Sequence, residues 1–144
     1  MTQKMSALVC MLLSGICVAD SWTVDDDGKA DFNSIQEAIN AASDGDFISV
    51  QEGTYYESIN FLGKAIRVEG INAETTIING GSQLGAVVTF DTGETNLSVL
   101  SKFTIVEGTG NFWLDPIFGQ QRCGGGIYCE LSSPFIQWCT ISNN

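Results

Sequence analysis

Four apolar residues near the start of the chain recur at positions i, i+3, i+4 and i+7. They are Ile35, Ala38, Ile39 and Ala42. This spacing places them on one face of a short α-helix. Ser34 precedes Glu37 by three residues, the spacing of a capping box at a helix N-terminus, and Asp44-Gly45-Asp46 ends the helix. Since so short a helix is unstable alone, we expect it to cover an apolar surface.

From Phe47 onward the apolar period changes to two. Ile48 and Val50 alternate with Ser49, as in a strand with one buried face, and we expect a turn at Gly53-Thr54. Similar short segments recur to the end of the chain, and a further strand is expected at 22–24. The later predicted strands are residues 58–61, 66–68, 76–78, 87–90, 97–100, 103–106, 127–129 and 135–141.

Four pairs of apolar residues in neighbouring predicted strands are each eleven positions apart in the sequence. The first members of the first three pairs are separated by 18 and then 22 residues. The pairs are Ile48 and Ile59, Ile66 and Ile77, Val88 and Val99, and Ile127 and Trp138. Repeats near 20 residues are typical of a solenoid. We therefore predict an all-β chain folded as a right-handed parallel β-helix, with residues 35–42 as a helix that caps its first coil. Glycines between the strands are expected to supply positive φ.

Composition and charge argue against some classes of function. The 144 residues contain 44% hydrophobic and 16% charged residues, which predicts one folded domain. The net charge is −11, with six Lys and Arg against seventeen Asp and Glu. This balance argues against nucleic acid or an anionic membrane as partner. The absence of His removes the commonest neutral-pH base and metal ligand.

Residues 1–19 have the pattern of a secretory signal peptide. Lys4 precedes an apolar run that ends at Cys17-Val18-Ala19, a small-x-small cleavage site. The run is too short for a membrane-spanning anchor, and Ile16 stands where a lipidation site at Cys17 would carry a small residue. We expect cleavage before Asp20, no membrane insertion afterwards, and a protein that is secreted, periplasmic or at the cell surface.

Cleavage leaves Cys123, Cys129 and Cys139. In an oxidising compartment they can form one disulfide of undetermined pairing, or they can be small buried hydrophobes. Neither they nor the Asp25-Asp26-Asp27-Gly28 segment has the ligand spacing of a metal site. We interpret the acidic segment as a turn, and we expect no metal and no cofactor.

The opening of the chain resembles pectin-lyase-like β-helix proteins, pectinesterases especially. The resemblance rests on VDDDGKADF (24–32), SIQEAI (34–39) and GTYYE (53–57). It covers residues 23–68, and it implies the fold more strongly than a function, because unrelated activities share these capping and first-coil residues. GGGIYC (124–129) and CTISNN (139–144) resemble coils of secreted bacterial β-helix proteins that continue for many more coils.

The resemblance also suggests catalytic candidates. Pectinesterases use an Asp nucleophile in a D-F-I-F-G motif, a second Asp and a later Arg. Residues 115–119, DPIFG, echo the motif, Asp91 is a second carboxylate, and Arg122 is the local Arg. Pro116 departs from the motif because it cannot sit in a central strand. We therefore assign no catalytic residue and keep Asp91, Asp115 and Arg122 as candidates.

Residues 109–123 interrupt the repeat, and we predict a loop insertion there. Its aromatic and amide side chains suit sugar rings, and the packing alternative is that Trp113 and Phe118 cover the coil wall. The glycan-binding candidates are Phe112, Trp113, Gln120 and Gln121.

The predicted organisation is a signal peptide (1–19), an N-terminal cap (20–46) and coils (47–144). We expect a secreted noncatalytic module, structural or glycan-binding, that forms the N-terminal part of a longer repeat protein. The alternative is a pectinesterase-like or polysaccharide-lyase-like enzyme whose active site is incomplete in this chain. The expected partner is a polysaccharide. Because no capping segment follows Ile141, we also expect self-association through the C-terminal coil.

Overall fold

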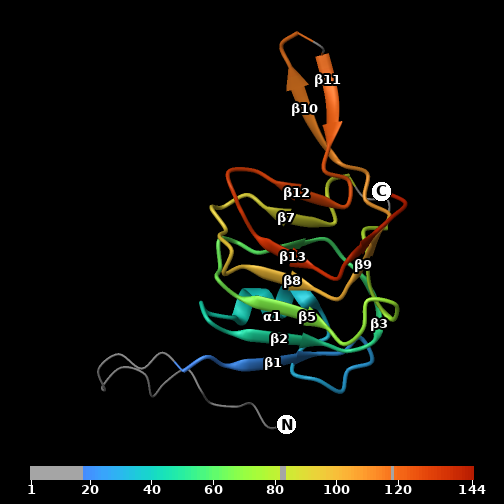
Figure 1. Ribbon diagram of the computed structural model, residues 1–144. Helices are drawn as coiled ribbons and strands as arrows, with labels where there is room; N and C mark the ends of the chain where they lie inside the picture. The colour runs from blue at the N-terminus through green and yellow to red at the C-terminus, as the bar shows by residue number, and fades with distance from the viewer. Residues whose placement is uncertain (1–17, 82–83, 118) are drawn as a thin grey trace.

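The computed structural model describes residues 18–81, 84–117 and 119–144. Most of the predicted signal peptide, residues 1–17, therefore lies outside the described residues. Three parallel sheets form the walls of a solenoid, with a short helix near its N-terminal end and a hairpin projecting from the other end (Figure 1). This is the predicted right-handed parallel β-helix.

In the described part of the chain, the three walls contain twelve strands. Wall A consists of β1 (Ser21–Val24), β2 (Phe47–Val50), β5 (Arg67–Gly70), β8 (Val99–Ser101) and β13 (Phe135–Gln137), hydrogen-bonded in that order. Wall B consists of β3 (Gly53–Tyr56), β6 (Thr76–Asn79), β9 (Thr104–Val106) and β14 (Thr140–Ile141). Wall C consists of β4 (Ile59–Asn60), β7 (Val88–Phe90) and β12 (Ile127–Cys129).

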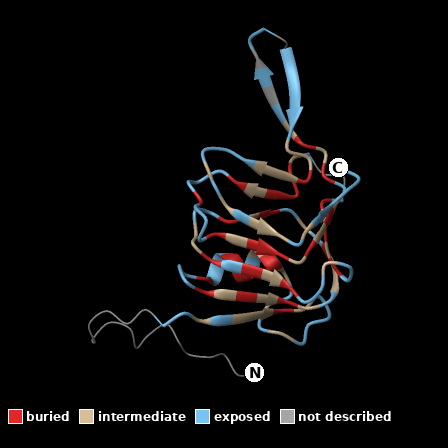
Figure 2. Cartoon of the chain, in the orientation of Figure 1, coloured by how far each residue is buried: buried red, intermediate tan, exposed pale blue. Residues whose placement is uncertain are grey.

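The core lies inside the walls because alternate residues of each strand point inward. In wall A, Ile48, Val68 and Leu100 stack in register and are fully buried. In wall B, Tyr55, Ile78 and Ile105 form the equivalent buried stack. Figure 2 shows this buried interior running along the solenoid.

The predicted repeat of about 20 residues is wrong beyond the first coil. Ile48, Val68, Leu100 and Ile136 occupy equivalent positions in successive coils, so the coils lengthen from 20 to 32 and 36 residues. The spacing of eleven relates walls within one coil, as it does for buried Ile48 and Ile59. Corners between walls can hold extra residues without disturbing the stack, so coil length is free to vary.

The eleven-residue pairs also gave wrong orientations, including that of Trp138, which is 66% exposed, and some strand boundaries were wrong as well. Ile77 and Val99 are only half-buried, and their neighbours Ile78 and Leu100 point into the core. The turn expected at Gly53-Thr54 is part of β3, which pairs with β6. The single strand expected at 135–141 is two strands, β13 and β14, separated by a corner.

Helix α1 (Ile35–Ala41) covers the core at the N-terminal end, as predicted. Ile35, Ala38 and Ile39 are fully buried, and Ala42 is nearly so. The side chain of Ser34 accepts a hydrogen bond from the backbone of Glu37, which confirms half of the expected capping box.

The other half of the cap comes from Glu57. Its carboxylate accepts hydrogen bonds from the Ser34 hydroxyl at 2.8 Å and from the backbone N–H groups of Ile35 and Gln36 at 2.8 and 2.9 Å. A carboxylate at this position complements the positive end of the helix. The first coil therefore fixes the start of the helix that covers it.

Two further side chains attach α1 to wall C and to the first corner. The Gln36 amide accepts from the Asn60 N–H at 2.7 Å and donates to the Asn60 carbonyl at 3.2 Å, so it pairs with the edge of β4 as a strand would. The Lys64 ammonium donates to the carbonyls of Ile39, Asn40 and Ala42 at 2.7–2.9 Å, which satisfies the last turn of the helix.

The predicted loop insertion is a β-hairpin. Strands β10 (Asn111–Asp115) and β11 (Gly119–Cys123) pair antiparallel, with Phe112 opposite Arg122 and Asp115 opposite Gly119. The hairpin projects away from the solenoid (Figure 1). The sequence signal was weak because β11 is exposed throughout and has no apolar alternation.

Several glycines allow close packing of the backbone and do not adopt a positive φ. Gly108 and Gly70 have ordinary φ, and a Cβ on Gly108 would lie 2.0 Å from the Gly125 carbonyl oxygen. Conversely, bulky residues take positive φ at coil corners, including Lys102 (61°) and Trp138 (54°). The expectation that glycines mark the positive-φ corners therefore holds only in part.

Candidate functional site

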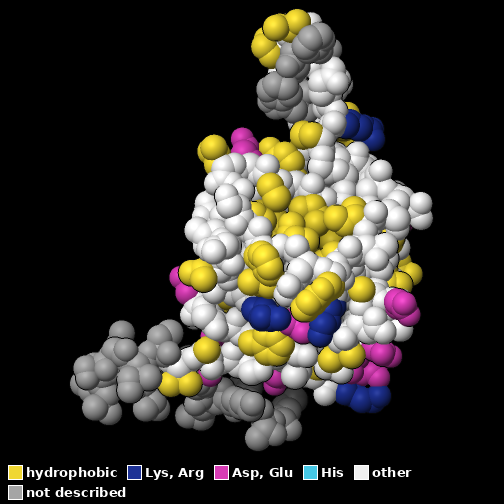
Figure 3. Space-filling view, viewed as in Figure 1, with side chains coloured by type: hydrophobic (Ala, Val, Ile, Leu, Met, Phe, Trp, Pro, Cys, Tyr) yellow, Lys and Arg dark blue, Asp and Glu magenta, His cyan; other side chains and the backbone are white. Residues whose placement is uncertain are grey.

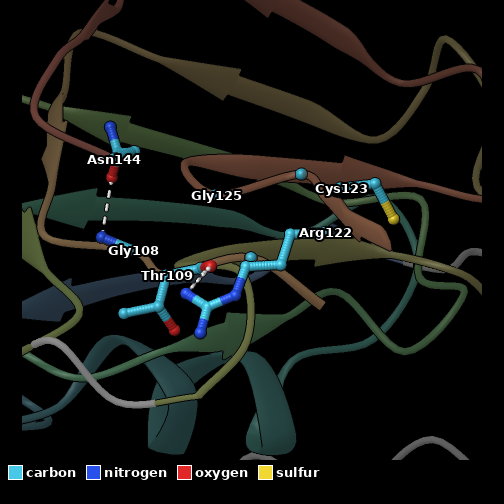
Figure 4. A pocket seen from close by; sticks show the side chains of 8 residues that line it. Gly108, Thr109, Arg122, Cys123, Gly125 and Asn144 are labelled. Atoms are coloured by element: carbon cyan, nitrogen blue, oxygen red, sulfur yellow. Dashed lines mark hydrogen bonds between the residues drawn. The ribbon is translucent and has the colours of Figure 1, made fainter. Parts of the chain in front are cut away.

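A hollow lies at the base of the hairpin, where β10 and β11 leave the solenoid. Its volume is about 480 Å³. Its lining comes from the segments on both sides of the hairpin and includes Thr109, Arg122, Cys123, Gly125 and Asn144 (Figure 4).

Glycines allow the two hairpin ends to approach the solenoid. The N–H groups of Thr109 and Gly110 both donate to the Gly85 carbonyl, at 3.2 and 3.0 Å. The missing side chain of Gly108 leaves room for the Gly125 carbonyl, and that carbonyl in turn accepts from the Val87 N–H at 3.1 Å. The hairpin is thus fixed to the preceding coil at its base, and only its distal part projects.

Arg122 forms the cationic side of the hollow. Its guanidinium carbon lies 4.6 Å from the centroid of the Phe112 ring across the hairpin, within the range of a cation–π contact. Its Nη1 donates to the Thr109 carbonyl at 3.3 Å. Figure 4 shows Arg122 turned toward Thr109, with Cys123 pointing away. These contacts hold an exposed cation and an aromatic ring side by side.

Asn144 closes the opposite side of the hollow. Its Oδ1 accepts from the Gly108 N–H at 2.8 Å, and its Nδ2 donates to the carbonyls of Ile105 and Ser142 at 3.0 and 2.8 Å. The side chain therefore links the last coil to the strand end that leads into the hairpin. Sequence reasoning missed Asn144 because the contact joins segments 36 residues apart.

The glycan-binding candidates lie on this hairpin. Phe112 is 47% exposed, and Gln120 and Gln121 are exposed. Trp113 is placed in β10 by its backbone, but its side chain and Phe118 lie outside the described residues, so the packing alternative stays untested for both. Phe112 contacts Arg122 on the hairpin itself.

The catalytic candidates are not brought together by the described backbone. Asp115 lies at the far end of β10, opposite Gly119. Arg122 pairs with Phe112, three residues and therefore about 10 Å along the hairpin from Asp115. Asp91 follows β7 on the solenoid, where its Oδ1 accepts from Asn60 Nδ2 at 3.1 Å and from the Thr92 hydroxyl at 3.0 Å.

The three cysteines are free thiols in this structure. Cys123 and Cys129 are exposed, so the alternative of buried hydrophobes is wrong for both. Cys139 is half-buried and packs against the core. Burial raises the pKa of the Cys129 and Cys139 thiols, which keeps them protonated and poorly nucleophilic at neutral pH. No disulfide joins any of these three.

Within residues 18–81, 84–117 and 119–144, no three His, Cys, Asp or Glu side chains cluster in a way that would hold a metal ion. The Asp25–Gly28 segment forms the expected turn, in which the Gly28 N–H donates to the Asp25 carbonyl at 3.3 Å. In the same described part of the chain, no helix has the length and hydropathy needed to cross a membrane.

Glu94 is a buried, hydrogen-bonded carboxylate that sequence reasoning missed. It is 2% exposed, and its carboxylate accepts from the Gly63 N–H, the Thr92 N–H and the Ser132 hydroxyl at 2.8–2.9 Å. These donors lie at the same corner of three successive coils. Burial raises the pKa of Glu94, but the three hydrogen bonds outweigh it and hold the pKa below its ordinary value.

Comparison with known proteins supports the fold and does not assign a family. No known protein-family profile matches the chain, and no curated protein matches it. Among solved structures it is similar to a pectin methylesterase from carrot, with 19% identity and a TM-score of 0.60. The likeness covers 90% of this chain and 44% of the carrot enzyme, so the chain spans less than half of that protein's length. The chain therefore shares the parallel β-helix fold of that protein, and at this identity the likeness concerns the fold alone.

Proposed function

We propose that this protein is a secreted, noncatalytic β-helix module that binds polysaccharide at the hairpin and the hollow beneath it. The observation that carries the proposal is the pairing of Phe112 with Arg122 beside a hollow of about 480 Å³. An aromatic face stacks on the C–H face of a sugar ring, while a guanidinium donates to hydroxyl or carboxylate oxygens. The coils serve as the rigid scaffold that holds this pair.

Three further features support the proposal. The pattern of residues 1–19 predicts export. The structural neighbour is named for action on pectin, which makes a polysaccharide a reasonable first ligand class to test. The hairpin stands clear of the coils (Figure 1), so a long polymer can reach it from several directions.

The separation of the catalytic candidates favours a noncatalytic role. General acid–base and nucleophilic catalysis require groups within hydrogen-bond reach of one another or of the same substrate atoms. Asp115 lies at the tip of the hairpin, Arg122 near its base and Asp91 on the solenoid. The alternative, an esterase that uses the DPIFG segment, is favoured only by the echo of the motif at residues 115–119.

Binding is tested by retention of the purified protein on immobilised pectin and on a neutral glucan. Phe112→Ala and Arg122→Ala should each lower retention about tenfold, consistent with roughly 1–2 kcal/mol for a lost aromatic or guanidinium contact. Trp113→Ala should also lower it without changing the melting temperature. The matched control is Leu131→Ala, since Leu131 is 95% exposed and belongs to a different corner.

Two outcomes would contradict the proposal. One is full retention by the Phe112 and Arg122 variants. The other is a Trp113 variant with a lowered melting temperature and unchanged retention, which would establish the packing alternative instead.

A further inference from the structure

Asp46, which precedes β2, is a buried carboxylate with a side chain that is 4% exposed. Its Oδ2 accepts from the Ser43 N–H at 2.9 Å and from Trp22 Nε1 at 3.1 Å, and its Oδ1 accepts from the Asp20 N–H at 2.8 Å. Burial raises the pKa of Asp46, but these hydrogen bonds and the charge of Lys64 hold the pKa below its ordinary value. The group is therefore ionised at neutral pH, and it joins β1 to the turn that follows α1.

Among the described residues, no Lys or Arg side chain forms a salt bridge with Asp46. The Lys64 ammonium donates instead to three carbonyls at the end of α1. Arg67 and Lys102 pair with Glu69 on the outer face of wall A, where Figure 3 shows basic side chains beside an acidic one. Buried charges in proteins are usually paired with an opposite charge. In this part of the chain, hydrogen-bond donors alone contact the buried carboxylate.

In the described residues, backbone pairing with the solenoid begins at Asp20. Its carbonyl accepts from the Phe47 N–H at 2.9 Å, next to the paired strands β1 and β2. Asp20 is half-buried, whereas Ala19 is exposed and Val18 is 72% exposed. The signal-peptide cleavage position predicted from the sequence, before Asp20, therefore coincides with the start of the fold.

We propose that removal of residues 1–19 gives Asp20 an α-ammonium group that forms an ion pair with Asp46. A signal peptidase would hydrolyse the Ala19–Asp20 bond with one water. The hydroxyl of that water goes to the Ala19 carbonyl carbon, which becomes the carboxylate of the released peptide, and its proton goes to the Asp20 nitrogen. The new amine takes a further proton at neutral pH, since an α-amino group ordinarily has a pKa of about 7.7–8.0. The nitrogen already lies 2.8 Å from Asp46 Oδ1, so the ion pair requires little movement.

Cleavage should therefore stabilise the N-terminal end of the solenoid. An ammonium donates a stronger hydrogen bond to a carboxylate than a neutral amide does. Asp46 also holds Trp22 of β1 and Ser43 beyond α1, so the added charge strengthens the attachment of both elements. The inference rests on the export that the proposed function includes, and it is independent of polysaccharide binding.

The test compares three forms of the protein by thermal unfolding at about pH 6.5, where an α-amine is charged. The first form begins at Asp20 with a free amine, the second is the same chain acetylated at that amine, and the third begins at Val18. Acetylation keeps an N–H donor on Asp20 and removes the charge, so the second form is the matched control. The free-amine form should melt roughly 3–6 °C above the other two. Equal melting temperatures of the first and second forms would overturn the proposal.

Two substitutions show whether the difference depends on Asp46. It should vanish in Asp46→Asn. It should persist in Asp44→Asn, which changes an exposed carboxylate two residues away. A difference that survives in Asp46→Asn, or one that also disappears in Asp44→Asn, would overturn the proposal.

Titration of the amine provides a readout that requires no variant. The charged groups around the Asp20 nitrogen are Asp46 and the carboxylate of Asp20 itself, which favour the ammonium, and Lys64, which acts on Asp46 and opposes it. Since the nearest charge is negative, the pKa of the amine should rise by about one unit or more above its ordinary value of about 8. The stabilisation is then complete below pH of about 8 and is lost as pH rises through the folded pKa.

The difference in melting temperature between the free and acetylated forms should therefore disappear at about pH 10. The pKa itself is measured from the rate of acylation at Asp20 as a function of pH. A value of about 8 or lower would overturn the proposal even if Asp46→Asn failed to fold. The intact mass of the full chain after export should correspond to Asp20 as the first residue, and a different first residue would also overturn it.

Discussion

Replacing Glu94 by Gln should weaken the connection between three coils. Its Oε2 accepts from the Thr92 N–H and the Ser132 hydroxyl, and its Oε1 accepts from the Gly63 N–H. A Gln keeps one acceptor oxygen and places an NH₂ group against a remaining donor. Each hydrogen bond to a charged group contributes roughly 1.5–3 kcal/mol, and a buried donor left unpaired costs a similar amount.

We therefore expect Glu94→Gln to lower the free energy of unfolding by about 3 kcal/mol. For a domain of this size that corresponds to a fall in melting temperature of roughly 10 °C. The assay is thermal and urea unfolding followed by circular dichroism at pH 7. The control is Glu130→Gln, because Glu130 is exposed and its carboxylate accepts from the neighbouring Tyr128 hydroxyl at 2.8 Å. A Glu94 variant as stable as the control would refute this account of the corner.

Because of Glu94, the stability of the protein should decrease at acidic pH. The pKa of Glu94 is below its ordinary value in the folded state, so the unfolded chain binds its proton more readily. Its stabilising contribution is complete above the ordinary pKa, near 4.5, and is lost as pH falls through the lower folded value. Stability measured from pH 7 down to pH 3 should fall more steeply for the wild type than for Glu94→Gln. Parallel curves would contradict this assignment.

Three other substitutions test the cap and the hairpin base by the same unfolding assay. Ile39→Asp puts a charge on the fully buried face of α1 and should lower the free energy of unfolding by about 3–5 kcal/mol. The control Asn40→Asp changes an exposed residue of the same helix and should lower it by under about 1 kcal/mol. Equal unfolding midpoints would show that α1 is not a cap. Lys64→Met removes three hydrogen bonds to the end of α1 and should lower the free energy of unfolding by about 2–3 kcal/mol. An unchanged free energy of unfolding would mean that water satisfies those carbonyls instead. Gly108→Ala drives a Cβ into the Gly125 carbonyl and should cost about 1–3 kcal/mol, and an unchanged midpoint would mean that the hairpin base is not closely packed.

The sequence predicted the features that follow from local periodicity. The stripe of α1 and the alternation of Ile48 and Val50 each reflect a single element, so the helix and the β-helix architecture were both found. Coil length was mispredicted because the corners are free to expand. The orientations of Ile77, Val99 and Trp138 were also wrong. For Ile77 and Val99 the reason is that a shift of one residue exchanges the inner and outer faces of a strand.

The candidate site was predicted only in outline. The 109–123 segment was identified because it breaks the repeat, but its hairpin pairing depends on cross-strand contacts such as Arg122 with Phe112. Glu94 and Asn144 bind groups 31 to 39 residues away in sequence. No local spacing reveals such contacts, because they exist only once the coils are stacked.

Polysaccharide binding and the absence of catalysis can be measured together in one experiment on partly methylated pectin. The purified protein is equilibrated with the polymer, and bound protein and released methanol are measured on the same samples, alongside Arg122→Ala and Asp115→Asn. We expect binding by the wild type, weaker binding by Arg122→Ala, and no methanol from any of the three proteins. Methanol release that disappears in Asp115→Asn, or binding equally strong in Arg122→Ala, would contradict the proposed function.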